Sequence, residues 1–434
     1  MSAWSASSGR SGTARSVGSL FFPLDDRLRL SVEDFSPDAL RLAIRQVQKA
    51  ASFQDASDDL RELANVPIAP SYLQKLSLRI GKEWKDLHDA DVQAFRDGGL
   101  PQGAVATARV AAVMVDGGRV QMRQDKAGRG VCARHWRESK VACLLTLLSK
   151  VHAVDPRPEP PQKFLDRVEA ARLAAEVKSR GRGAAARAKP EAARPSGTRR
   201  RKRADRPQKL VRTVLGSLAC SEEFGWQVAA EVERRGLGGM ERKGYICDGQ
   251  KYNWSIYELH LQPWGFVAIL DFIHLLGYLY GAAQAAQGKG TEAAWQCYER
   301  WLRWAWSGRV RALLAELRAA SARCGQPPPD CAEEDPRKVL AEAVSYVSNN
   351  EKRMDYPHYR RLGLPISSAA VESTIKQLNR RVKGSEKFWG SGGAEAMLQL
   401  RAAYLSEDDR VGRYGAMPRP RYRAVGEKRI NKTP

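Results

Sequence analysis

The chain has 434 residues, enough for two or three domains that each bury a core. Its 72 lysines and arginines against 49 acidic residues give a formal charge of +23, which predicts a polyanionic partner, nucleic acid first and an anionic membrane second. The seven cysteines contain no Cys-x-x-Cys pair, so they argue against a disulfide framework or a zinc finger and suit a cytoplasmic protein.

Three helices are expected near the N-terminus, after a Ser/Gly/Arg-rich stretch at residues 1–36 that we predict to be a disordered tail. Apolar residues at helical spacing begin at Pro37, and further helices are expected over Asp55–Ala64 and Ser71–Lys82. This layout is typical of a helix-turn-helix DNA-binding domain, which we assign to residues 37–100. An ordinary three-helix packing unit is the alternative. In the first case the outward face of the third helix carries Tyr72, Gln74, Lys75 and Arg79.

Strand-like runs come next. Ala106–Asp116 has the pattern of a buried strand, with Arg119–Gln124 as its expected hairpin partner across an Asp-Gly-Gly turn and Glu138–Leu148 as a third strand. Residues 155–209 then become basic and rich in Gly, Ala and Pro, with 13 Lys/Arg against two acids between 178 and 209. We predict a flexible basic loop there. Its densest part is Arg199, Arg200, Arg201, Lys202 and Arg203.

The second half of the chain alternates between strands and helices. Gly244–Asp248 and Phe266–Asp271 have strand patterns, and helical periodicity dominates from Phe272 to about Leu362. A last helix is expected over Leu364–Val382, and residues 406–434 are predicted to form a basic tail. The pattern as a whole indicates an α/β fold.

One apolar stretch, Trp264–Ala283, is long enough to imitate a membrane span. Asp271 and His274 lie near its middle, where a charge costs about 2.5–3.5 kcal/mol on insertion scales. We therefore expect a buried strand that runs into a helix, and no membrane segment.

Three acidic residues are placed at the ends or starts of these elements. Asp116 and Asp248 close strand-like runs, and Glu372 lies in the first turns of the last helix. Each has a plain explanation when taken alone, because Asp-Gly is a turn signal and an acid early in a helix gains from the helix dipole. Their order on strand, strand and helix suggests a common site. Carboxylates gathered in this way repel one another unless a cation lies between them, which predicts Mg²⁺.

Four sequence strings, in this order, resemble those of bacterial insertion-sequence transposases, nearest to the ISKra group. They are Val-Asp-Gly-Gly-Arg-Val, Asp-Gly-Gln-Lys-Tyr-Asn-Trp, Ile-Leu-Asp-Phe-Ile-His and Leu-Pro-Ile-Ser-Ser-Ala-Ala-Val-Glu-Ser. The resemblance runs from about Phe53 to about Tyr404. It implies a ribonuclease H-like mixed sheet at 101–272, an all-α insertion at 273–362 and the final helices of the core at 363–405.

The resemblance also implies a chemistry. Asp116, Asp248 and Glu372 would be the catalytic triad and the ligands of two Mg²⁺ ions, with Mn²⁺ as a substitute. The implied activity is cleavage of the terminal inverted repeats of an insertion sequence and transfer of the cut ends to target DNA. The implied partner is double-stranded DNA, bound by a homodimer or larger assembly in the bacterial cytoplasm, at the nucleoid.

Other residues at the expected site are open to more than one interpretation. Asp271 and His274 match an Asp-x-x-His pattern of the family, and we interpret them as a hydrogen-bonding pair, with an accessory catalytic role as the alternative. The sequence departs from the family pattern at Ser367-Ser368-Ala369, where a glycine is expected near the acid. The long basic segment at 155–209 is a second departure.

Basic and aromatic residues provide further candidates for DNA contacts. Lys376, Arg380 and Lys383 recur at helical spacing beyond the glutamate and predict contacts to the phosphate backbone, with a solvated basic face as the alternative. With these three, the predicted DNA-binding set comprises Gln74, Lys75, Arg79, Arg199, Arg200, Arg201, Lys202 and Arg203. A set of aromatic residues is expected either to fill a core or to stack on unpaired bases: Trp295, Tyr298, Trp301, Trp304 and Trp306.

Two rival hypotheses concern other classes of protein. The first is a DNA-binding regulator descended from a transposase, with a silent triad; the three intact acids argue against it. The second is a structural nucleic-acid-binding protein that binds through the basic segment at 178–209.

Overall fold

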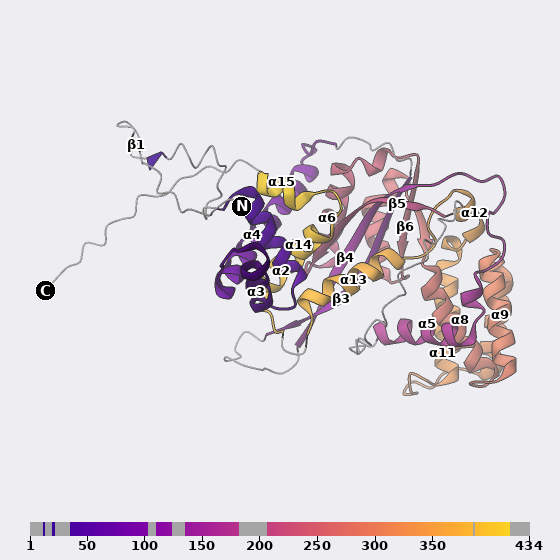
Figure 1. Ribbon diagram of the computed structural model, residues 1–434. Helices are drawn as coiled ribbons and strands as arrows, with labels where there is room; N and C mark the ends of the chain where they lie inside the picture. The colour runs from indigo at the N-terminus through magenta and orange to yellow at the C-terminus, as the bar shows by residue number, and fades with distance from the viewer. Residues whose placement is uncertain are drawn as a thin grey trace. The chain divides into compact units, whose positions relative to one another are not determined.

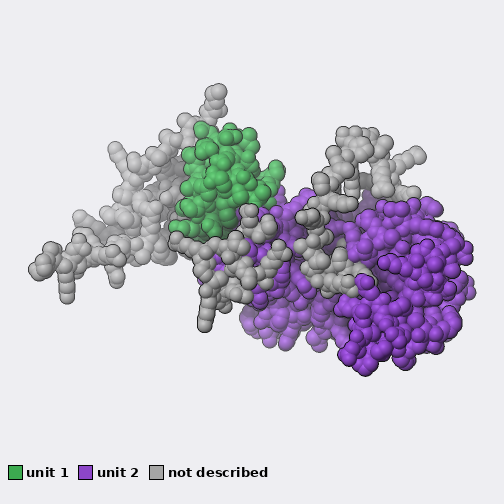
Figure 2. Space-filling view, turned by 90° about the horizontal axis from the view of Figure 1, so that it is seen from below, with its two compact units in different colours: residues 1–80, 406–434 green, residues 81–405 purple. Residues whose placement is uncertain are grey.

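The computed structural model describes residues 12–13, 20–21, 35–102, 110–123, 135–181, 206–384 and 387–416. The chain forms two compact units, residues 1–80 with 406–434 and residues 81–405 (Figure 2). The division falls inside one long helix. The domain boundaries expected at residues 100, 272 and 362 stay predictions.

The first unit is helical. It contains α2 (Pro37–Lys49), α3 (Phe53–Ala64), the start of α4 (Pro70–Arg96) and α15 (Arg410–Ala416), with a two-residue strand pair, β1 (Gly12–Thr13) and β2 (Leu20–Phe21). Serines begin the first two helices, since Ser36 accepts a hydrogen bond from the Ala39 amide and Ser52 forms a capping box with Asp55. Most of the predicted tail at 1–36 and of the predicted basic tail at 406–434 lies outside the described residues.

The predicted helices of this unit are confirmed, with one correction. α4 continues to Arg96, well past the predicted end at Lys82. Apolar residues keep helical spacing beyond that point, since Ile80 and Trp84 are both buried, and no glycine or proline after Lys82 stops the helix before Gly98.

The second unit is built on a mixed sheet of five strands (Figure 1). The order across the sheet is β5-β4-β3-β6-β7, in which β3, β4 and β5 pair antiparallel and β6 and β7 run parallel to β3. The strands span Val110–Met122 (β3), His135–Leu148 (β4), Gln208–Ser217 (β5), Arg242–Cys247 (β6) and Val267–Leu270 (β7). The α/β prediction is therefore confirmed.

The predicted hairpin across Asp116-Gly-Gly is wrong. β3 runs straight through Asp116, Gly117 and Gly118, and these residues pair with Val141, Lys140 and Ser139 of β4. Neither glycine has the positive φ that a tight hairpin turn demands. The glycines instead allow close approach, because a Cβ at Gly118 would lie 2.9 Å from the Ser139 hydroxyl oxygen.

Helices cover both faces of this sheet. On one face lie α13 (Ala369–Val382) and α14 (Ser391–Leu405): Cys143 Sγ of β4 lies 3.2 Å from the Thr374 hydroxyl of α13, and Gly216 of β5 packs against Ala402 of α14. On the other face lies α6 (Ser221–Arg234), since Arg235 at its end bonds to Thr213 of β5. Successive residues of a strand face opposite sides of the sheet, so Asp116 lies on the same face as Gly118. Gly118 packs on Ile375, so this is the face that α13 covers.

A helical group lies beside the sheet, with α5, α8, α9 and α11 labelled in Figure 1. Its helices are α5 (Arg167–Gly181), α8 (Phe272–Gln287), α9 (Glu292–Trp306), α10 (Val310–Cys324), α11 (Pro336–Asn350) and α12 (Tyr356–Arg361). The prediction of helices from 272 to 362 is confirmed. The last predicted helix exists but begins at Ala369, five residues later than Leu364.

The predicted flexible loop at 155–209 is wrong for part of its length. The structure has a 3-10 turn at Gln162–Phe164 and then α5, while β5 starts at Gln208. α5 packs on α8 so closely that a Cβ at Gly277 would lie 2.8 Å from Val177 Cγ1. Of the described side chains of α5, only Ala170 and Leu173 are buried, so its apolar pattern is weak in the sequence. Arg199–Arg203 lie outside the described residues.

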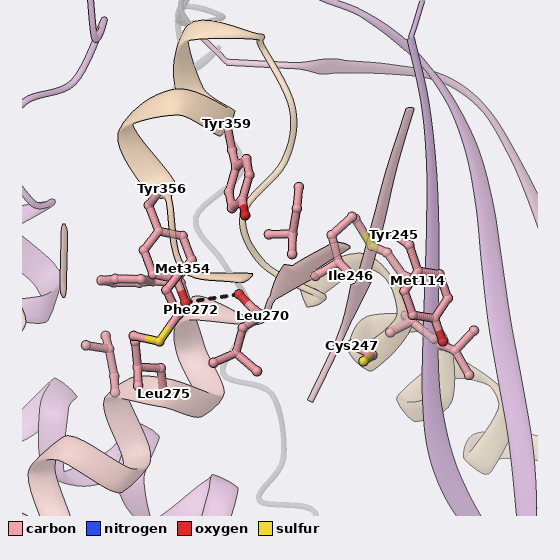
Figure 3. Close-up of a cluster of buried hydrophobic side chains, with 14 of the residues drawn as sticks. Met114, Tyr245, Ile246, Cys247, Leu270, Phe272, Leu275, Met354, Tyr356 and Tyr359 are labelled. Atoms are coloured by element: carbon pink, nitrogen blue, oxygen red, sulfur yellow. Dashed lines mark hydrogen bonds between the residues drawn. The ribbon is translucent and has the colours of Figure 1, made fainter. Parts of the chain in front are cut away.

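The main core joins the sheet to this helical group. Figure 3 shows Phe272, Leu275, Met354 and Tyr356 packed together near the end of β7, with the Tyr356 hydroxyl donating to the main-chain oxygen of Leu270 at 3.1 Å. The strand-to-helix interpretation of Trp264–Ala283 is confirmed, since β7 runs into α8 there. Among the described residues, every helix is too short or too polar to cross a bilayer.

Candidate active site

Three aspartates lie at corresponding positions along three adjacent parallel strands, Asp116 inside β3, Asp248 just after β6 and Asp271 just after β7. Residues of β3 and β6 that pair with each other differ in residue number by 132 (242 − 110). Asp116 and Asp248 also differ by 132, so they are in line with this register. Paired residues of β6 and β7 differ by 23 (270 − 247), and so do Asp248 and Asp271, whose amide donates to the Cys247 oxygen at 2.9 Å. Because neighbouring strands are about 4.8 Å apart, the register brings these three residues close together.

Asp116 stands inside β3 and is 9% exposed. Its Oδ1 accepts a hydrogen bond from the next amide, that of Gly117, at 2.7 Å. Gly117 faces the opposite side of the sheet, where a Cβ would lie 3.2 Å from a Glu138 carboxylate oxygen and 3.5 Å from the Tyr252 hydroxyl oxygen.

Asp248 follows the last residue of β6 and is also 9% exposed. Gly249 has a φ of 91°, so the chain turns sharply here and carries Asn253 back to the aspartate. The Asn253 amide donates to Asp248 Oδ1 at 2.8 Å, and the Gln250 amide donates to the same oxygen at 3.2 Å. No described residue donates to Oδ2, so this oxygen can face a cation.

Glu372 lies next to a hydrogen-bonded group formed by Ser368, His274 and Asp271. Ser368, which precedes α13 and is 1% exposed, donates its hydroxyl to Asp271 Oδ2 and lies 3.5 Å from Glu372 Oε1. His274 Nδ1 lies 2.7 Å from Asp271 Oδ2 and 3.9 Å from Glu372 Oε1. Ser368 and His274 therefore both contact the fully buried Asp271 and lie beside the glutamate.

The charges at this edge act on His274. Burial by itself lowers the pKa of His274, but the hydrogen bond and charge of Asp271, with the carboxylates of Asp248 and Asp116, outweigh it and raise the pKa to about 9. Burial raises the pKa of Tyr252 first of all, and Asp248, Glu138 and Asp116 raise it further. Asp116 and Asp248 both raise the pKa of His274 and of Tyr252, so the two carboxylates act on the same surroundings.

The donor chemistry of this edge suits a hard cation. Asp116, Asp248 and Glu372 offer carboxylate oxygens, the ligands that Mg²⁺ prefers. Ligand atoms of Asp271, His274 and Glu372 also lie within 4.8 Å of one another and can form a metal-binding group. Both oxygens of Asp271 are already engaged, Oδ1 with the Ile273 amide and Oδ2 with His274 and Ser368. Asp271 therefore fits an anchoring role better than that of a ligand.

The predicted DNA-binding residues fall into separate groups. Gln74 and Lys75 are exposed on α4 and Arg79 is half-buried there. On α13, Lys376 and Arg380 are exposed, and Lys376 lies 3.7 Å from Glu176 of α5. Lys383 is half-buried with its ammonium 5.0 Å from the ring centre of Trp136, and its pKa is lowered by burial and by Arg119.

Sequence reasoning missed two residues that shape the site. Asn253 lies within the Asp-Gly-Gln-Lys-Tyr-Asn-Trp string, but its contact with Asp248 depends on the turn at Gly249. Ser368 was noted only as a departure from the family pattern. Serine at a helix start usually caps the helix, and here it makes no cap bond but turns to Asp271 instead. Only the folded structure shows that the Ser368 side chain does not cap α13.

No protein-family model and no curated protein matches this chain. The resemblance to insertion-sequence transposases rests on the four strings quoted above.

Proposed function

We propose that this protein is a Mg²⁺-dependent DNA transposase with Asp116, Asp248 and Glu372 as its catalytic triad. The observation that carries the proposal is the arrangement at the sheet edge. Asp116 and Asp248 are aligned when the β3–β6 register is extended by two residues, and Glu372 lies beside Ser368 and His274, which both contact Asp271. A buried acidic edge within a chain of charge +23 favours chemistry on a polyanion.

The sheet topology supports the ribonuclease H-like part of the proposal. In chain order the five strands are arranged third, second, first, fourth, fifth, with only the second antiparallel to the others. A helix that carries the glutamate follows the helical group and packs on the first strand. This is the order of elements that the resemblance implies.

Each residue of the chain has a definite task in this proposal. Asp116, Asp248 and Glu372 would hold Mg²⁺, and Asn253 orients Asp248 through its amide. Bound Mg²⁺ supplies positive charge that activates the attacking oxygen and stabilises the leaving one in phosphodiester cleavage and strand transfer. Lys376 and Arg380, exposed beyond Glu372 on the same helix, bind the DNA backbone next to these acids. Gln74 and Lys75 on α4 recognise the terminal repeats.

The experiment uses linear DNA that carries the sequences flanking the gene. With Mg²⁺, the full-length protein is expected to nick this DNA at the element ends and to join them to a target plasmid. Asp116→Asn is expected to lose both reactions and to bind Mg²⁺ more weakly by calorimetry, while DNA binding in a gel-shift assay persists. Asp330→Asn, which removes an exposed acid far along the chain, is the matched control.

Two outcomes would overturn the proposal. Strand transfer by Asp116→Asn at the wild-type rate with Mg²⁺ would remove the triad from the mechanism. Specific binding of the ends by the wild-type protein without cleavage, in Mn²⁺ as well as Mg²⁺, would identify the silent regulator instead.

A further inference from the structure

The turn after Asp248 has a backbone conformation that a glycine alone does not fix. Gly249 has a φ of 91°, and glycine populates many other conformations at little cost. The peptide group after Asp248 directs the chain toward the Gln250 amide and the Asn253 side chain, which both donate to the carboxylate. A contact from outside the turn can therefore decide how well these two donors stay in place.

Tyr346 of α11 makes such a contact. Its hydroxyl donates to the main-chain oxygen of Asp248 at 2.8 Å. Its ring fills the space beside Gly249, where a Cβ would lie 2.9 Å from Tyr346 Cε2. Burial first of all, and then the charge of Asp248, raise the pKa of Tyr346, so the hydroxyl keeps its proton and stays a donor. Hydroxyl and ring together hold the peptide group between Asp248 and Gly249 in one orientation.

The position of the Tyr346 ring is itself fixed by the helical group. The ring stacks on that of Tyr278 of α8, with ring centres 3.8 Å apart and planes 13° from parallel. α8 begins directly after Asp271, so both helices reach the acidic edge of the sheet. Burial raises the pKa of Tyr278, and the charges of Glu342 and Asp248 raise it further, which places this ring near the same carboxylate.

The end of α11 also contacts the helix that carries Asn253. This helix, α7 (Lys251–Ile256), includes Trp254, and the Arg353 guanidinium lies 4.0 Å from the centre of the Trp254 ring. Arg353 follows α11 and donates to Asn350 Oδ1 at 3.1 Å, and the Asn350 amide donates to the main-chain oxygen of Tyr346 at 2.9 Å. The helical group thus contacts both the peptide after Asp248 and the helix that supplies its amide donor.

We propose that Tyr346 is a positioning residue for Asp248, through which the helical group sets the affinity of the acidic edge for Mg²⁺. The inference rests on the proposed function, because it takes Asp248 as a ligand of Mg²⁺. Groups that orient a metal ligand typically contribute about 10- to 100-fold to metal affinity. Tyr346 acts on the main chain of the ligand rather than on its carboxylate, so we expect the lower end of that range.

The test is Mg²⁺ binding to the full-length protein by calorimetry, together with the Mg²⁺ dependence of cleavage of DNA that carries the sequences flanking the gene. Tyr346→Phe keeps the stacked ring and removes only the hydroxyl. It is expected to raise the Kd for Mg²⁺ about 10-fold and the Mg²⁺ concentration for half-maximal cleavage by a similar factor. Saturating Mg²⁺ is expected to restore the cleavage rate, and the KM for DNA is expected to stay unchanged.

Tyr359→Phe is the matched control. It removes the same kind of bond, from a tyrosine hydroxyl to the main-chain oxygen of Ala268 in β7 at 3.2 Å. Both variants are expected to lower the melting temperature to a similar extent, because each loses one hydrogen bond to a carbonyl oxygen. Only Tyr346→Phe is expected to bind Mg²⁺ more weakly than the wild type.

Three outcomes would overturn the inference. Wild-type Mg²⁺ affinity in Tyr346→Phe would do so alone, and normal cleavage by that variant would leave the proposed function intact. An equal loss of affinity in Tyr359→Phe would show that destabilisation, and not positioning, causes the effect. A wild-type protein that neither binds Mg²⁺ nor cleaves DNA would overturn the proposed function and this inference together.

Discussion

A buried ion pair ties the loop after β4 to the helical group, and its removal is expected to be costly. Arg360 of α12 is 1% exposed, and its guanidinium donates to Asp155 Oδ1 at 2.9 Å and to the Trp306 oxygen at 2.9 Å. The same guanidinium lies 4.1 Å from the centre of the Trp306 ring. Asp155→Asn removes the compensating charge and leaves the buried guanidinium in place.

The expected loss follows from the burial. Removing one partner of a buried pair costs about 3–5 kcal/mol, and the Asp155 side chain keeps 16% exposure, so we expect the lower end of that range. Burial alone raises the pKa of Asp155, but the hydrogen bonds and charge of Arg360 outweigh it and lower the pKa below its usual value of 3.8. The pair therefore stabilises the fold fully above about pH 4, and this contribution is lost as the pH falls through the lowered pKa.

The assay is urea unfolding of the full-length protein followed by tryptophan fluorescence, at neutral pH and in steps down to about pH 3. Glu292→Gln, which breaks an exposed pair with Arg167, is the control and is expected to cost less than about 1 kcal/mol. The double variant Asp155→Asn/Arg360→Met is expected to recover part of the loss, because no unpaired charge stays buried. The reasoning fails if Asp155→Asn costs no more than the control, or if the double variant is the least stable.

Three further predictions concern the site and the DNA. Ser368→Ala is expected to weaken Mg²⁺ binding about 10-fold by calorimetry, with Ser368→Thr close to wild type and Ser373→Ala as an unaffected neighbour; equal affinities would exclude a positioning role. Gly249→Ala is expected to lower stability by at least about 1 kcal/mol, because an alanine is strained at positive φ and its Cβ would lie 2.9 Å from the Tyr346 ring. Thermal denaturation measures this loss, and an unchanged melting temperature would contradict the turn. Lys75→Ala is expected to weaken binding to the terminal repeats and to lower the salt slope by about 1, whereas an unchanged slope would remove that contact.

Local patterns in the sequence were sufficient for most elements. The helices after Pro37, strand β6 and the passage from β7 into α8 follow from apolar spacing over a few residues, which burial on one face dictates. The placement of Asp248 after a strand and of Glu372 in the first turn of a helix also follows from local pattern.

Tertiary contacts decided the rest. Asp116-Gly-Gly has the composition of a turn, yet pairing with β4 and the close approach of Ser139 keep it in a strand. α5 lies within the basic segment and packs on α8, where Val177 contacts Gly277, a residue 100 positions away (277 − 177). Neither outcome is visible in a local pattern, because each depends on a partner brought in by folding.

The candidate site shows the same division. Residue types and local pattern establish which acids are present and on which kind of element each lies. Folding aligns Asp116, Asp248 and Asp271 across neighbouring strands and brings Ser368 to Asp271, beside Glu372. The register depends on the hydrogen bonds between strands, and the partner of the Ser368 hydroxyl depends on where α13 packs. Residue type and spacing therefore predict neither.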